Sequence, residues 1–190
     1  MPHLAYTPEA NEFLAADPLG LLVGMLLDQQ VPMEKAFTSP HVLAERMGVQ
    51  RLDAAQIAEF DPEEFEQLFR RVPALHRFPA AMAKRVQELA RVLIERFGGD
   101  PASVWTDATT GSELVTRIGA LPGFGAQKAK IFAALLGKQF SVQPKGWQEA
   151  SEPFGEKNVF RSVADVTDDP SLQKVRAFKK EQKAAAKQAG

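Results

Sequence analysis

The sequence Leu121-Pro122-Gly123-Phe124-Gly125-Ala126-Gln127-Lys128-Ala129 joins two expected helices. The two glycines predict a tight turn, because glycine adopts backbone conformations that strain other residues and lets a ligand approach closely. The helix that begins near Gly125 or Ala126 offers unpaired amide N–H groups and a positive dipole end, which suit a phosphate. We therefore favour a phosphate-binding turn. The alternative is a plain corner between two helices that binds nothing.

The turn lies in a basic window of a chain whose net charge is −1. From residue 114 to residue 148 there is no Asp or Glu. The same window has a charge of +5, contributed by Arg117, Lys128, Lys130, Lys138 and Lys145. A basic patch of this kind binds polyanions by releasing their counterions. The window therefore predicts a nucleic acid as the partner.

Composition limits the classes of protein and site. A chain of 190 residues with 45% apolar and 25% charged residues can fold as one domain or as two small lobes. The absence of cysteine excludes disulfides, thiolate zinc sites, cysteine-ligated iron–sulfur clusters and a thiol nucleophile. Three scattered histidines make a structural metal site improbable. With neither a secretion signal nor a membrane span expected, we predict a cytoplasmic protein without a cofactor.

Helix-start signals recur along the chain and predict an all-α fold of many short helices. A capping oxygen precedes a proline at Thr7-Pro8, Asp17-Pro18, Ser39-Pro40, Asp61-Pro62 and Asp100-Pro101. A helix that is apolar on nearly all sides follows Asp17, which predicts a central, buried element. Other helices are expected over 40–47, 62–70, 79–97, 102–105 and 112–118.

Two segments near the C-terminus differ in character. Residues 140–155 are rich in Gly, Pro, Gln and aromatic residues, which predicts an ordered loop. Residues 174–190 form helix readily and carry six Lys or Arg against one Glu. This tail is either a solvated terminal helix or an additional contact with nucleic acid.

Two motifs together resemble the helix-hairpin-helix (HhH-GPD) DNA glycosylase superfamily of base-excision repair. One is the hairpin at 119–130; the other is Leu26-Leu27-Asp28-Gln29-Gln30-Val31-Pro32-Met33-Glu34-Lys35-Ala36, which starts at the end of the buried helix. The second is similar to the Gln-Gln-Val-Ser pattern of the alkylpurine enzymes. With no cysteines, the chain looks closer to 3-methyladenine DNA glycosylase II than to iron–sulfur endonuclease III. The resemblance implies a two-lobed helical domain over residues 1–165, with residues 166–190 as a basic helix or tail.

The resemblance implies roles for matching residues only. The hairpin would hold a phosphate of the damaged strand, with a monovalent cation on its carbonyl groups. These hairpin residues are Leu121, Pro122, Gly123, Phe124, Gly125, Gln127, Lys128 and Lys130. Gln30, with Gln29 beside it, would fill the gap that an extruded base leaves. Helix-end capping is the alternative role for both glutamines. Trp147 and Phe124 could stack on a base or belong to the local core.

The chain departs from the family pattern at both usual catalytic positions. Gln127 occupies the place of the nucleophilic lysine, and Lys128 follows one residue later, about 100° further around the helix. We therefore expect no lyase chemistry. The segment 141–147, where the catalytic aspartate is expected, contains no carboxylate. Since N-glycosidic cleavage builds positive charge on the sugar, a carboxylate must come from elsewhere. The candidates are Asp28, which could instead be a simple helix-end residue, and Glu149.

These observations leave three hypotheses. The first is a monofunctional DNA N-glycosylase that removes a modified base, expected to be a purine, from double-stranded DNA. The second is a non-catalytic protein of the same fold that binds damaged or distorted DNA. The third is a helical adaptor in which the hairpin is only a corner. A monomer is expected in each case.

Overall fold

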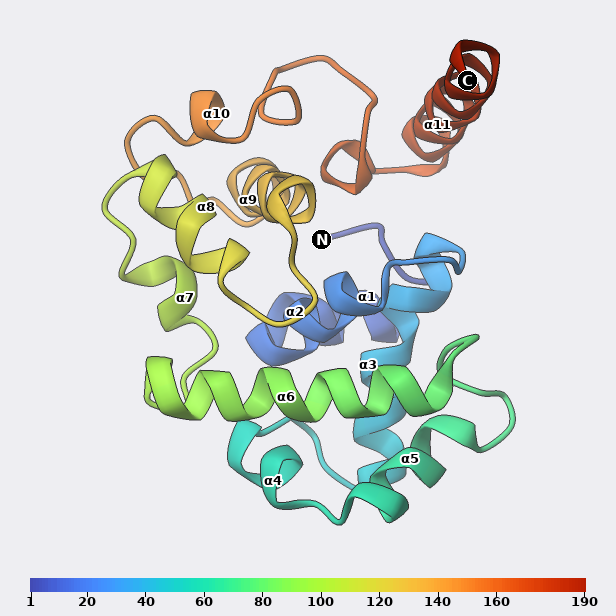
Figure 1. Ribbon diagram of the computed structural model, residues 1–190, viewed down its shortest axis with the longest axis vertical. Coiled ribbons are helices and arrows are strands. Elements are labelled where there is room, and N and C mark those ends of the chain that lie inside the picture. Colours follow the sequence, from blue (N-terminus) through green and yellow to red (C-terminus); the bar gives the residue numbers. More distant parts are fainter.

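The computed structural model describes residues 1–190 and is built from helices without a β-sheet (Figure 1). This confirms the all-α prediction. The α-helices are α1 (Pro8–Ala16), α2 (Pro18–Leu27), α3 (Met33–Met47), α4 (Ala54–Glu59), α5 (Pro62–Arg70), α6 (Pro79–Phe97), α7 (Ser103–Thr106), α8 (Gly111–Gly119), α9 (Ala126–Gln139), α10 (Trp147–Ala150) and α11 (Asp169–Ala189). A short 3-10 helix, η1 (Val163–Asp165), precedes α11.

Most of the predicted capping signals start helices. The side chains of Thr7, Asp17 and Asp61 each accept a hydrogen bond from a first-turn amide, with proline as the next residue. The prediction at Ser39-Pro40 is wrong, because α3 begins at Met33 and contains both residues. The Ser39 hydroxyl instead donates to the carbonyl oxygens of Lys35 (2.8 Å) and Leu75 (2.7 Å). A serine inside a helix can thus imitate a cap in the sequence.

The helices form two groups that share one core (Figure 1). Helices α1 to α6 pack on one another and make the first lobe. Helices α7 to α10, η1 and the beginning of α11 make the second lobe. Helix α2 is buried along almost its whole length, as its composition predicts, and it contributes side chains to both groups. A fully buried Leu or Phe contributes about 1.5–3 kcal/mol, so the lobes are held together through α2.

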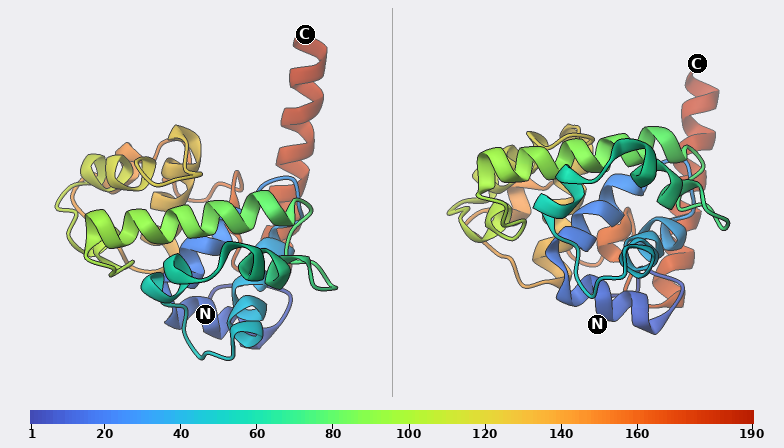
Figure 2. Two further views of the ribbon diagram at one scale, coloured as in Figure 1. Left: turned by 60° about the horizontal axis from the view of Figure 1, so that its bottom comes forward. Right: turned by 90° about the horizontal axis from the view of Figure 1, so that it is seen from below.

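The last helix departs from this compact arrangement. Leu172 and Val175 are buried near its start, whereas every residue from Lys179 onward is exposed. Figure 2 shows this part of α11 extending away from the body of the molecule.

No single helix combines the length and apolar composition of a membrane crossing. Only α1 and α2 taken together meet those criteria, and they are bent by 116° relative to each other.

Candidate nucleic-acid interface and active site

The predicted hairpin links α8 to α9 by a six-residue turn, Ala120–Gly125. Gly123 has φ +82°, a backbone conformation that glycine adopts without strain. Gly125 occupies the N-cap position of α9, and no side chain caps this helix. The first amide N–H groups of α9 therefore lack side-chain partners beside the exposed Gly125, as a phosphate-binding turn requires.

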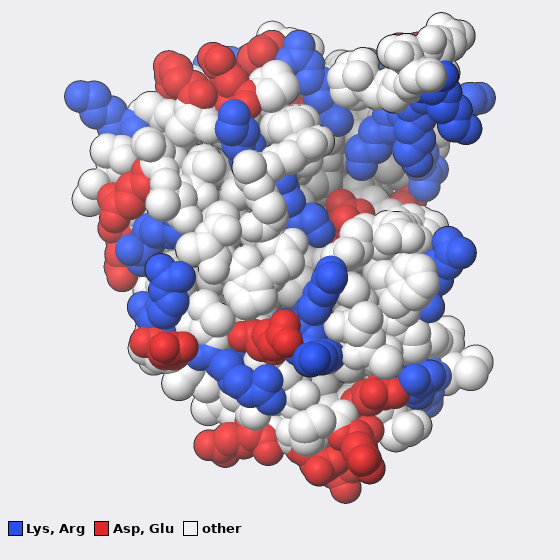
Figure 3. All heavy atoms as spheres, in the orientation of Figure 1, with Lys and Arg blue, Asp and Glu red and all other residues white.

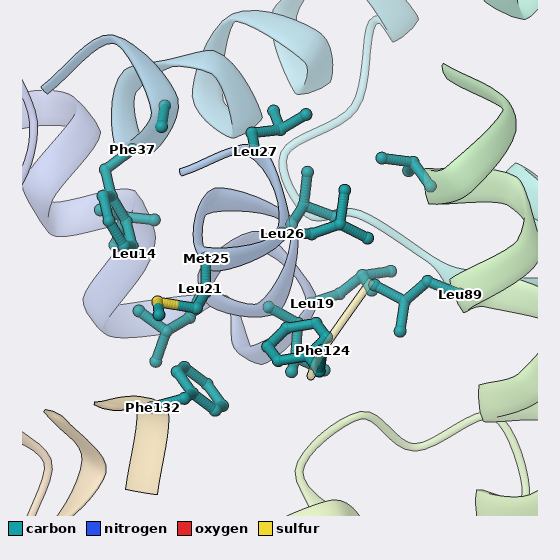
Figure 4. Close-up of a cluster of buried hydrophobic side chains, with 14 of the residues drawn as sticks. Leu14, Leu19, Leu21, Met25, Leu26, Leu27, Phe37, Leu89, Phe124 and Phe132 are labelled. Carbon is teal, nitrogen blue, oxygen red and sulfur yellow. The ribbon is translucent and has the colours of Figure 1, made fainter. Parts of the chain in front are cut away.

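The apolar residues of the hairpin fix its position on the core. Leu121 and Phe124 are 3% and 4% exposed, which shows that Phe124 belongs to the local core rather than to a base-stacking surface. The Phe124 ring meets Phe132 of α9 edge to face, with centroids 5.9 Å apart. Figure 4 shows the Phe132 ring next to Leu21 and Met25 of α2 and the Phe124 ring next to Leu19. The Leu26 side chain lies 3.3 Å from the position that a Cβ atom would take at Gly123. The hairpin is thus anchored to the C-terminal end of the buried helix.

The Asp28-Gln29-Gln30 turn follows α2 and is held by two basic side chains, the half-buried Lys128 and the buried His76. Lys128 donates from Nζ to the carbonyl oxygens of Met25 (2.9 Å), Leu26 (3.3 Å) and Asp28 (3.4 Å). His76 lies within hydrogen-bonding distance of the carbonyl oxygens of Leu27 (3.1 Å) and Gln29 (2.9 Å). Lys128 thus points to the end of α2, and joins α9 to the turn.

The two glutamines of this turn lie in different environments. Gln29 donates to the Leu26 carbonyl oxygen (2.8 Å), and its side-chain oxygen accepts from Arg85 of α6 (3.2 Å). Gln30 is exposed and has φ +57°, a conformation that is uncommon for a residue other than glycine. Gln29 therefore has the capping role that the sequence left open. Gln30 presents its side chain at the surface from a strained backbone position.

A cleft of about 890 Å³ lies at the junction of the two lobes. Its walls come from four places: the end of α2 with the turn after it, the start of α3, the start of α9, and α11 between Leu172 and Lys183. The cleft brings Asp28, Gln29, Gln30, Gln127 and Lys128 together. Arg176, Lys179 and Lys183 of α11 line the same space. Figure 3 shows the surface hollowed between the molecular body and the basic side chains over α11.

Asp28, which is half-buried, differs from Asp17, the buried aspartate at the other end of α2. Asp17, at the start of the helix, accepts hydrogen bonds of 2.7 Å from the amides of Gly20 and Leu52, which is a structural role. The Asp28 carboxylate lines the cleft, where it accepts no hydrogen bond and forms no ion pair. Burial raises the pKa of Asp28, and the charges of Lys179 and Lys128 oppose that rise. A free carboxyl group with a raised pKa suits acid–base chemistry.

Lys128 has the opposite shift, because burial lowers its pKa and the nearby Asp28 only partly offsets this. A lysine of lowered pKa is a potential nucleophile. Here, however, the ammonium donates to three backbone carbonyl oxygens, and an ammonium has three N–H donors. Its protons are engaged, so Lys128 acts as a structural cation.

Glu149 and Trp147 lie outside the cleft, on α10. A short helix thus replaces part of the predicted loop. The Trp147 ring occupies the space beside Gly137, where a Cβ atom would overlap it, and the backbone at Trp147 crosses close to Gly111. Gly137 is nine residues beyond Lys128, about 14 Å along α9. Trp147 therefore packs α10 on α8 and α9, far from the turn, and Glu149 is exposed there.

Three of the five cations of the predicted basic patch bind other groups of the protein. Arg117 donates to the carbonyl oxygens of Ser103 (2.6 Å) and Val104 (2.8 Å), and Lys138 pairs with the buried Asp165 at 2.5 Å. Lys128 caps α2, as described above. Of the five cations, Lys130 and Lys145 form neither a side-chain hydrogen bond nor an ion pair. The patch is therefore smaller than the charge count predicts.

A family model described as "HhH-GPD superfamily base excision DNA repair protein" matches residues 23–189. The chain belongs to this superfamily. Neither a curated protein nor a solved structure matches the chain. The matched span extends from α2 to the end of α11 and includes the hairpin.

Sequence reasoning missed several residues in and around this cleft. His76 lies 47 residues from the Gln29 carbonyl that it contacts, and no local pattern connects them. Glu34, at the start of α3, lines the cleft and pairs with Arg176 at 2.6 Å. The cations of α11 can be recognised in the sequence, because they recur at helical spacing. The sequence does not show that this helix lies beside the cleft. No group of His, Asp and Glu side chains in the structure could hold a metal ion.

Proposed function

We propose that the protein is a monofunctional DNA N-glycosylase, which extrudes a modified base from duplex DNA and removes it by hydrolysis. The observation that carries this proposal is the Asp28 carboxyl group, which lies without a partner in the cleft beside the hairpin. The fit with the alkylpurine side of the superfamily, and hence with a purine substrate, rests on the Gln29-Gln30-Val31 sequence and on the absence of cysteine.

The chemistry needs a carboxylate at this place. As the N-glycosidic bond breaks, positive charge develops on the sugar, and a fixed carboxylate stabilises it or takes a proton from the attacking water. Asp28 is the acidic residue of the cleft that has no partner, since Glu34 pairs with Arg176. With Gln127 in the lysine position and Lys128 bound to carbonyl groups, hydrolysis is favoured over Schiff-base chemistry.

DNA would meet the protein at the hairpin. The uncapped amides of α9 would bind one phosphate of the damaged strand, and the hairpin carbonyls would bind a monovalent cation. Gln30, exposed in its left-handed conformation, would enter the space vacated by the base. Unstacking costs a few kcal/mol, least for a damaged base, which contributes to selectivity. The protein would work as a monomer.

The test is base release from a panel of lesion-containing duplexes, read as alkali-labile abasic sites, by the native protein and by Asp28→Asn. We expect release from at least one lesion and a loss of about a hundredfold or more in the variant, as for removal of a general acid–base group. Because Asp28 must be ionised to act as a base, the native rate should fall as the pH drops through its raised pKa. Asp53→Asn is the matched control, because Asp53 caps α4 away from the cleft. Full activity of Asp28→Asn would remove Asp28 from the mechanism.

The second candidate is a non-catalytic protein that binds damaged or distorted DNA. It is favoured by the lack of a carboxylate in residues 141–147 and by the surplus of cations in the cleft. Asp28 and Glu34 there face Lys128, Arg176, Lys179 and Lys183. Tight binding to distorted duplex, with no base released from any lesion, would select this candidate.

A further inference from the structure

Helix α11 carries a continuous cationic stripe, of which Arg176 alone forms an ion pair within the protein. At 100° per residue, positions 176, 179, 180, 183 and 187 fall within an arc of about 100°. These five residues are Arg176, Lys179, Lys180, Lys183 and Lys187, and together they line one shallow surface groove along the helix. Glu181, the acidic residue of this segment, lies on the opposite face of the helix. Figure 3 shows the basic side chains gathered over α11.

The base of the helix is fixed to the body of the protein. Leu172 and Val175 are buried, and Arg176 pairs with Glu34 across the cleft at 2.6 Å. Glu34 has a second carboxylate oxygen that is buried without a partner, so its charge depends on Arg176 for compensation. The direction of the stripe relative to the cleft is therefore set by packing and by one ion pair.

Beyond Lys183 the stripe leaves the cleft and continues along the projecting part of α11 (Figure 2). Lys179 and Lys183 line the cleft itself, whereas Lys180 and Lys187 do not. Every residue from Lys179 to the C-terminus is exposed. Isolated helices of this length are marginal in water. Repulsion between like charges three and four residues apart weakens this one further.

We infer that α11 is a phosphate-binding arm, which holds the backbone of duplex DNA where it leaves the cleft. The inference rests on the proposed function for the position of the DNA and extends it to a second binding surface. A polyanion on the stripe would relieve the repulsion between its lysines and release counterions from the DNA. The arm would therefore order further when DNA binds, and its contribution would depend steeply on salt.

The experiment compares two double variants of the full chain that change net charge equally. Lys180→Gln with Lys187→Gln removes two stripe cations outside the cleft and keeps a good helix former. Lys157→Gln with Lys174→Gln is the matched control, because both lysines are exposed and neither lies on the stripe. For each protein, the affinity for a duplex is measured against salt concentration. Amide hydrogen exchange of residues 179–189 is followed with and without that duplex.

We expect the stripe variant to bind more weakly at low salt. Its slope of log affinity against log salt should be smaller by about 0.9 for each phosphate that the arm no longer neutralises. The control should keep the native slope, and the native arm should gain protection from exchange with DNA. Equal slopes for the two variants, or unchanged exchange in the arm, would overturn the inference. Tighter native binding to anionic phospholipid vesicles than to the duplex at the same salt would also overturn it.

The outcomes separate this inference from the proposed function. If binding depends on the stripe but no base is released from any lesion, the inference about α11 is supported and the glycosylase proposal is wrong. If the stripe variant and the control have the same salt dependence of affinity while base release persists, the inference about α11 is wrong and the glycosylase proposal is supported.

Discussion

His76 stabilises the Gln29-Gln30 turn in one protonation state. It is 1% exposed, and the Phe78 amide donates to its Nδ1 at 3.0 Å. An amide N–H can only donate, so Nδ1 accepts and the proton of the neutral ring lies on Nε2, facing the carbonyl oxygens of Leu27 and Gln29. A second proton would have to displace the Phe78 amide.

This predicts a pH dependence of stability. Burial lowers the pKa of His76 from its usual 6.5, so below pH 6.5 the unfolded chain binds a proton that the folded protein excludes. The free energy of unfolding should therefore fall as the pH drops below 6.5, by no more than about 1.4 kcal/mol per pH unit for one proton. Urea unfolding of the native protein and of His76→Gln between pH 7.5 and 5 measures the difference. Identical pH slopes would show that His76 titrates alike in both states.

The sequence predicted which charged residues surround the hairpin better than it predicted their interaction partners. The charge count around the hairpin correctly identified five cations without local acids. It could not show that Lys138 meets Asp165, 27 residues away, or that Lys128 meets the end of α2, 100 to 103 residues away. Long-range partners depend on how the lobes pack, and this information is spread over the whole core rather than held in one motif.

At the scale of elements, local signals located most helices. Capping residues followed by proline correctly gave the starts of α1, α2 and α5, and the glycine-rich turn gave the border of α8 and α9. The failures have a physical reason in each case. Pro32 precedes α3 without a side-chain cap, so the start of this helix has no polar signal. Helix α10 has four residues and depends on the packing of Trp147 against Gly137.

The hairpin element allows phosphate binding to be separated from stability. Gly125 has extended φ and ψ values, and no atom lies within 4 Å of the place where its Cβ would stand. Asp therefore fits there and is a preferred cap, so Gly125→Asp should gain a few tenths of a kcal/mol in stability. The same carboxylate would occupy the anion site. We expect duplex affinity to fall about tenfold or more, since like charges in contact cost several kcal/mol.

Gly125→Ser is the matched control for this prediction, because serine caps the helix without adding charge. Thermal unfolding and duplex binding of the two variants would be compared with the native protein. Equal affinity of Gly125→Asp and Gly125→Ser would show that no phosphate approaches the N-terminus of α9.

At the scale of the whole molecule, one side chain joins the two lobes beside the cleft. Lys128 belongs to α9, in the second lobe, and its ammonium caps carbonyl groups at the end of α2, in the first. The hairpin and the Gln29-Gln30 turn are thus held in a fixed relation. If the hairpin holds a phosphate and Gln30 fills the vacated base position, the distance between the hairpin and the turn determines where the extruded base lies relative to Asp28.

Lys128→Met keeps the apolar stem of the lysine and removes the ammonium. The carbonyl oxygens of Met25, Leu26 and Asp28 would lose a charged donor, so we expect the free energy of unfolding to fall by about 1–3 kcal/mol. Lys130→Met, two residues away and without a side-chain partner, should change it by less than about 0.5 kcal/mol. Urea unfolding measures both. If base release also falls in Lys128→Met more than stability explains, the lysine sets the geometry of the cleft. Equal effects of the two variants would mean that the interaction of Lys128 with α2 contributes nothing to the junction of the lobes.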